Sequence, residues 1–118
     1  AALALMEPMI PGAPAVPAAD ERTHRALEAA AADVARAAEG YTAIVNGRFK
    51  GGWTTRHYGQ PQNGVHAIQM ELSQISHLTT EEPPFAYDDE KAGQLRIHLN
   101  QILARIEAVA DQLKTKGN

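Results

Sequence analysis

The sequence contains no cysteine among its 118 residues. This absence excludes disulfides, thiolate metal sites and cysteine nucleophiles together, and it fits a cytoplasmic protein. Aromatic residues are also scarce, with one tryptophan, three tyrosines and two phenylalanines, so an isolated core would be thin. No apolar run approaches the length of a membrane span. We therefore expect one small domain, or part of a larger one, without a membrane partner.

A strong charge of either sign is missing too. Lysine and arginine together number 11 and aspartate and glutamate 14, which gives a net charge of −3 with neutral histidines. The basic cluster at residues 48–56 is too small to indicate a nucleic-acid partner for an acidic chain. A small molecule is the expected partner, and the oligomeric state stays open.

Residues 1–19 are predicted to form a linker or loop. Proline lacks a backbone donor and fixes φ, and this segment carries prolines at positions 8, 11, 14 and 17. The segment also lacks the basic start of a signal peptide. The chain opens on Ala1 rather than methionine, which leaves truncation open.

Two amphipathic helices frame the remainder, residues 20–118. The first runs from Asp20, which can cap it, to Gly40, and its narrow apolar face consists of Leu27, Ala30, Ala31, Val34 and Ala38. The second begins at Asp88 or Asp89. Its apolar residues alternate four and three positions apart, at Leu95, Leu99, Ile102, Ile106, Val109 and Leu113.

Two short strands are predicted between the helices, over residues 41–46 and 65–72, with a glycine-rich loop over residues 47–64. This order of elements predicts an α/β fold, with part of a mixed or parallel sheet flanked by helices. Two strands alone do not make a stable sheet with covered faces. We therefore expect further strands from residues outside this chain or from a partner.

Chemically useful residues concentrate in residues 46–72, which read NGRFKGGWTTRHYGQPQNGVHAIQMEL. Glu71 lies near the end of the second predicted strand, and α/β sheets bind ligands beyond the carboxyl ends of their strands. Its neighbours Met70 and Leu72 would partly desolvate the carboxylate, which favours a general base. The alternative is a strand-end glutamate paired with an arginine, and the local pattern does not decide between them.

Arg48 and Arg56 flank the glycines of the same stretch. Each presents a rigid fork of donors that suits a carboxylate, so together they indicate an anionic substrate. The alternative is that both are solvated surface residues, which the nearby Lys50 makes less favoured. The glycine spacing matches neither a dinucleotide fingerprint nor a P-loop.

His57 and Tyr58 follow Arg56 directly. A lone histidine is more often a hydrogen-bonded loop or core residue than a ligand, and Tyr58 either donates to a substrate oxygen or simply packs. No pair of histidines has the i, i+4 spacing or the HExxH setting of a zinc site. The sequence therefore predicts no metal ligand in this chain.

Taken together, NGRFKGGWTTRHYGQP, GVHAIQMEL and the PPFAYD segment before the last helix resemble the C-terminal part of N-formylglutamate amidohydrolases. The similarity covers residues 41–113. Its core is an asparagine, a basic or proline position, an aromatic residue, Gly-Gly, Tyr-Gly and a strand ending in Gln-x-Glu. Residues 20–118 would then be the C-terminal part of a single α/β hydrolase domain, related to the zinc-carboxypeptidase and aspartoacylase fold.

The resemblance implies hydrolysis of the formyl amide of N-formyl-L-glutamate, or a similar N-acyl amino acid, to formate and glutamate, late in histidine degradation. Zinc would polarise the amide carbonyl and activate water. Glu71 would match the general base that then acts as an acid. Arg48 and Arg56 would bind the substrate carboxylates or the developing oxyanion, and His57 and Tyr58 would line the same pocket.

The zinc ligands of the family, two histidines and an acidic residue, come from motifs before this stretch. Residues 1–40 contain one histidine, His24, without a matching context. The expected zinc would therefore take its ligands from outside this chain. Two hypotheses follow: the chain is part of a zinc amidohydrolase, or it is a metal-free binding or assembly module that retains a pocket for an acidic small molecule.

Overall fold

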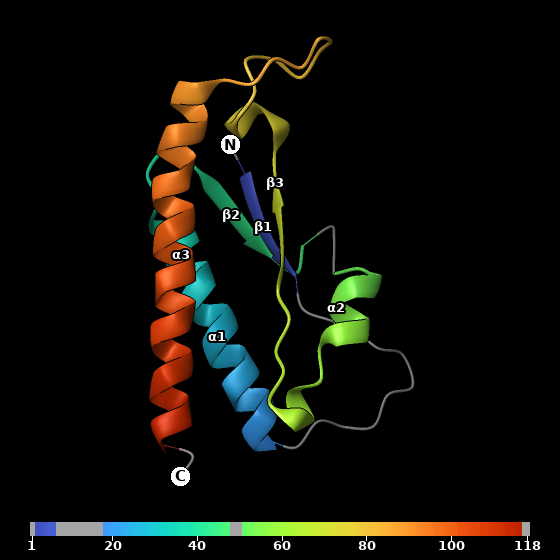
Figure 1. The fold of residues 1–118 in the computed structure, drawn as a ribbon, viewed down its shortest axis with the longest axis vertical. Coiled ribbons are helices and arrows are strands. Elements are labelled where there is room, and N and C mark those ends of the chain that lie inside the picture. Colours follow the sequence, from blue (N-terminus) through green and yellow to red (C-terminus); the bar gives the residue numbers. More distant parts are fainter. Residues whose placement is uncertain (1, 7–17, 48–50, 117–118) are drawn as a thin grey trace.

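The structure, a computed structural model, describes residues 2–6, 18–47 and 51–116 (Figure 1). Its elements are β1 (Ala2–Met6), α1 (Ala18–Ala37), β2 (Thr42–Val45), α2 (Trp53–Tyr58), β3 (Gln69–Leu72) and α3 (Asp89–Lys116). Short 3-10 turns cover Pro61–Asn63 and Gln74–Ser76. None of the described helices is long and apolar enough to cross a membrane.

The three strands form one mixed sheet in the order β2-β1-β3. β1 is parallel to β2, with Leu3 opposite Ala43, and antiparallel to β3, with Leu3 opposite Leu72. The predicted combination of helices and strands is thus confirmed. The third strand, expected from outside the chain, comes instead from residues 2–6.

The sequence places residues 2–6 in the predicted linker of residues 1–19, and for these five residues the structure shows a strand instead. The physical reason is that proline begins only at Pro8, so every residue of ALALM keeps the backbone donor that a central strand needs. Residues 7–17 lie outside the described part of the chain. α1 begins at Ala18, two residues before the predicted cap.

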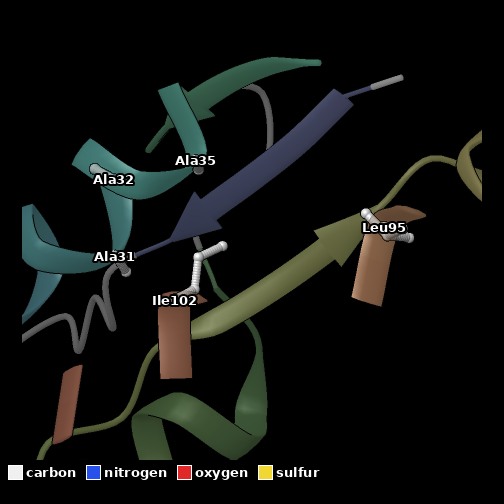
Figure 2. Close-up of a cluster of buried hydrophobic side chains, with 5 residues drawn as sticks. All are labelled: Ala31, Ala32, Ala35, Leu95 and Ile102. Atoms are coloured by element: carbon white, nitrogen blue, oxygen red, sulfur yellow. The ribbon is translucent and has the colours of Figure 1, made fainter. Parts of the chain in front are cut away.

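α1 and α3 lie side by side and cover one face of the sheet (Figure 1). Between them lies the buried core cluster, which consists of Ala31, Ala32, Ala35, Leu95 and Ile102 (Figure 2). Alternate strand residues pack against this cluster from the sheet: Ala43, Val45, Met70 and Leu72. Both predicted apolar faces are confirmed, because each of their residues is buried or half-buried. Alanine on α1 has little side-chain bulk, which lets the helix lie close to its neighbours.

The segment before α3 shows which aspartate caps the helix. The Oδ1 atom of Asp88 accepts a hydrogen bond from the backbone N–H of Lys91 at 3.0 Å, which is the geometry of an N-cap. Asp89 is the first helical residue. The sequence had left these two positions open, and the structure assigns the cap to Asp88.

We expect Asp88→Ala to lower the free energy of unfolding by about 1 kcal/mol, because the Lys91 amide loses its acceptor. Asp89→Ala is the matched control, since it removes only a charge near the helix start and is expected to cost about 0.5 kcal/mol or less. Urea unfolding followed by circular dichroism measures both. Equal losses for the two variants would contradict the cap assignment.

Candidate functional site

Glu71 lies on β3, on the sheet face opposite the helices. Because side chains alternate along a strand, Met70 and Leu72 point into the core cluster and Glu71 points away from it. Its side chain is exposed. The expected desolvation by Met70 and Leu72 is therefore wrong: the apolar neighbours in sequence lie on the other face. The carboxylate is instead open to water.

The direction of β3 also differs from the simple expectation for an α/β sheet. β3 runs antiparallel to β1, and Glu71 pairs with Ala4 near the middle of that strand. Glu71 is close to the carboxyl end of its own strand, as predicted, but not at the carboxyl edge of β1 and β2. The start of β3, Gln69, lies instead at that carboxyl edge, opposite Met6 at the end of β1.

The predicted glycine-rich loop contains a helix of six residues, α2, which the sequence analysis missed. Its N-cap residue is Gly52, and the carbonyl oxygen of Gly52 accepts hydrogen bonds from the N–H of Arg56 at 3.2 Å and from Thr55 Oγ1 at 2.9 Å. The helix ends at Tyr58, and the N–H of Gly59 donates to the Thr55 carbonyl at 2.9 Å. Glycines flank this segment on both sides, and because glycine is typical of turns and loops, the sequence did not predict a helix here.

Three of the predicted site residues lie next to one another on α2. Arg56 is exposed, and its Nη1 atom donates to the carbonyl of Gly51 at 3.4 Å. The ring of His57 stacks on that of Trp53, with centroids 4.3 Å apart and planes 12° apart. Tyr58 meets His57 edge-on at 4.7 Å. Trp53 and His57 are four residues apart, and residues at this spacing lie on the same face of a helix. This spacing is the sequence signal that could have predicted α2.

A glutamine joins α2 to Glu71. The Oε1 atom of Gln69 accepts a hydrogen bond from the Gly52 N–H at 2.9 Å, and its Nε2 atom donates to Glu71 Oε1 at 2.6 Å. The structure therefore brings Arg56, His57 and Tyr58 together on one helix and connects the start of that helix to Glu71. Arg48, the remaining predicted site residue, and Lys50 lie outside the described residues.

Two hollows occur elsewhere on the described surface. One, of about 460 Å³, is lined by Ile75, Thr79, Thr80, Glu81 and Glu82. The other, of about 210 Å³, is lined by Glu39, Gly40, Tyr41, Ile75, Ser76, Lys91 and Gln94. None of the described site residues, Arg56, His57, Tyr58 and Glu71, lines either of them. All four of these side chains are exposed in the described part of the chain.

The described residues do not fit the zinc that the resemblance implies. Within residues 2–6, 18–47 and 51–116, no three histidine, aspartate or glutamate side chains lie close enough to hold a metal ion. Two histidines meet between α1 and the segment before β3. The Nδ1 atoms of His24 and His66 are 3.3 Å apart and the rings stack at 5.4 Å, so these nitrogens face each other.

Comparison with known proteins gives one family and two relatives. The family described as N-formylglutamate amidohydrolase matches residues 11–77. N-formylglutamate deformylase of Pseudomonas aeruginosa is 47% identical over 83 residues, which cover 70% of this chain and 31% of the relative. N-formylglutamate deformylase of Pseudomonas putida is 44% identical over 71 residues, 60% of this chain and 26% of the relative. The chain thus spans about a third or less of these curated relatives, and no solved structure matches it significantly.

Proposed function

Because the chain belongs to the N-formylglutamate amidohydrolase family, we propose that it is part of an enzyme that hydrolyses the formyl amide of N-formyl-L-glutamate. The match over residues 11–77 contains α2 and Glu71, and this overlap carries the proposal. The named activity of the two relatives supports the same reaction. The proposal includes similar N-acyl amino acids as substrates. A zinc-carboxypeptidase-like fold, a cytoplasmic location and a place in histidine degradation belong to the proposal as well.

In the proposed mechanism, Glu71 acts as the general base. Its carboxylate takes a proton from water as the water oxygen forms a bond to the formyl carbon. It then returns that proton to the leaving amine nitrogen as the carbon–nitrogen bond breaks, giving formate and glutamate. The family match includes Glu71, and its exposed side chain is accessible to water.

α2 supplies the proposed substrate contacts. The exposed guanidinium of Arg56 presents donors for a substrate carboxylate. His57 and Tyr58, on the same helix, line the surface beside it. Arg48 stays a proposed second partner for the substrate. An acidic small molecule fits this set of donors better than a basic one.

Zinc remains the expected cofactor, with its ligands outside this chain. When bound, it would polarise the formyl carbonyl and acidify water. No step assigned above to Glu71 or α2 depends on its position.

The first experiment is an intact-mass and zinc determination on the protein purified from its source, followed by a formate-release assay on the same material. We expect N-formyl-L-glutamate to be hydrolysed with a kcat/KM at least tenfold above that for N-formyl-L-lysine, whose side chain carries the opposite charge. Absence of formate release from zinc-loaded protein would overturn the proposal. Equal rates for the two substrates would overturn the role of the arginines.

A metal-free binding module for acidic small molecules is the second candidate. It is favoured by one observation: α2 carries Arg56, His57 and Tyr58 next to one another with all three side chains exposed. Isothermal titration of the 118-residue chain with L-glutamate in EDTA tests it. Saturable binding in EDTA, together with no formate release from N-formyl-L-glutamate after zinc is added, supports the binding module, whereas binding that requires added zinc contradicts it.

A further inference from the structure

The side chain of Gln69 has a fixed orientation between two partners. The backbone N–H of Gly52 can only donate, so the oxygen of the Gln69 amide must face it, at 2.9 Å. The amide nitrogen then faces Glu71, where it donates to Oε1 at 2.6 Å. An ionised carboxylate only accepts, so both contacts have the correct donor and acceptor in this orientation alone.

We infer that Gln69 is a positioning residue that holds the carboxylate of Glu71 and the start of α2 in one arrangement. Gly52 is bonded through its carbonyl to Thr55 and Arg56, so its position is tied to that of the helix. Gln69 therefore connects the proposed base to the helix that carries the proposed substrate contacts. This inference rests on the proposed function, which it extends by one residue.

The surroundings of Gln69 suit this role. The residue is half-buried, and its hydrogen bond to Gly52 is partly shielded from water, whereas Glu71 and the bond that it accepts from Gln69 are exposed. An exposed glutamate on an open sheet face would otherwise sample several rotamers. The contact to Nε2 involves a charged acceptor and is short, which is typical of the stronger hydrogen bonds in proteins. Gln69 thus restricts a carboxylate that the core does not restrain.

The first test needs no substrate. In the 118-residue chain, the hydrogen-exchange rate of the Gly52 amide is measured by NMR for wild type, Gln69→Met and Gln69→Glu. Methionine has a similar length but no amide, so we expect Gly52 to exchange about tenfold faster. Glutamate keeps an acceptor for Gly52, so exchange close to wild type is expected. Gln101→Met, the same change at an exposed α3 position, is the control.

The second test separates kcat from KM in the preparation that hydrolyses N-formyl-L-glutamate. Gln69→Glu removes the donor to Glu71 and keeps α2 in place, so we expect kcat to fall about tenfold or more with KM near wild type. Gln69→Met releases both partners, so kcat should fall and KM should rise. Gln101→Met should change neither.

Each result decides a separate point. Unchanged Gly52 exchange in Gln69→Met would overturn the bridge to α2, whatever the activity. Wild-type kcat in Gln69→Glu would overturn the positioning of Glu71. If wild-type protein releases no formate, the proposed function fails, while the Gly52 exchange rates still report on the bridge.

Discussion

Replacing Glu71 by glutamine is expected to lower kcat for N-formyl-L-glutamate hydrolysis about 10²- to 10⁴-fold, the usual contribution of a general base. Glutamine has nearly the same shape as glutamate and keeps an Oε1 acceptor for Gln69 Nε2. The change therefore removes the basic oxygen with little effect on the fold. The loss should appear in kcat at saturating substrate, with zinc content unchanged.

The control for this experiment is Glu107→Gln, which makes the same chemical change at an exposed position on α3. It should leave kcat and KM within about twofold of wild type, as is usual for surface substitutions away from a site. Turnover of Glu71→Gln equal to that of Glu107→Gln would remove Glu71 from the mechanism. The family membership would stand in that case, because it does not depend on this residue.

Ile102→Ala is expected to have the largest effect on stability. Ile102 is fully buried in the core cluster between α1 and α3 (Figure 2). Truncation to alanine removes apolar burial and leaves a cavity, which lowers the free energy of unfolding by about 2–5 kcal/mol. Domains of this kind have a total stability of about 5–15 kcal/mol, so a large fraction of the stability would be lost.

The next residue provides the matched control. Leu103 is 64% exposed, so Leu103→Ala removes an aliphatic side chain from the same helix without opening a cavity. We expect its effect to stay within about 0.5 kcal/mol. Urea unfolding midpoints of both variants measure the difference. Equal destabilisation would mean that α3 does not bury the face that the structure shows.

The helices were predictable because their signals are local. The spacing of Leu95, Leu99 and Ile102 is a property of one continuous segment, and the structure buries or half-buries all three. The N-cap of α3 was predictable to within one residue, at Asp88 or Asp89, for the same reason. Here side-chain period and capping chemistry act within a few positions, and no distant partner has to be known.

The sheet was less predictable because strand pairing is not local. Residues 2–6 form a strand by pairing with β2 and β3, both far away in the sequence. The predicted strand over residues 65–72 is shortened to Gln69–Leu72, and Val65 instead pairs with Gln60 in an isolated bridge. The local sequence of neither segment indicates which other segment of the chain it pairs with.

In the candidate site, too, residues with a local signal were predicted, and residues that depend on distant contacts were not. The sequence identified Arg56, His57, Tyr58 and Glu71 from their chemistry, and their roles stay predictions. It missed Gln69 and Trp53, whose importance depends on contacts to Gly52, Glu71 and His57. It also misjudged the exposure of Glu71, because apolar neighbours in a strand point to the opposite face.

The central place of β1 in the sheet has a consequence for folding kinetics. β1 precedes both of its neighbours in the chain, and its residue Leu3 pairs with Ala43 on one side and Leu72 on the other. The sheet therefore cannot close until two long stretches of chain have been brought back to the same strand, which is an entropic cost that slows folding. α1 and α3, by contrast, gain most of their hydrogen bonds from near neighbours. Assembly of the sheet, rather than formation of the helices, is thus the expected slow step in reaching this fold.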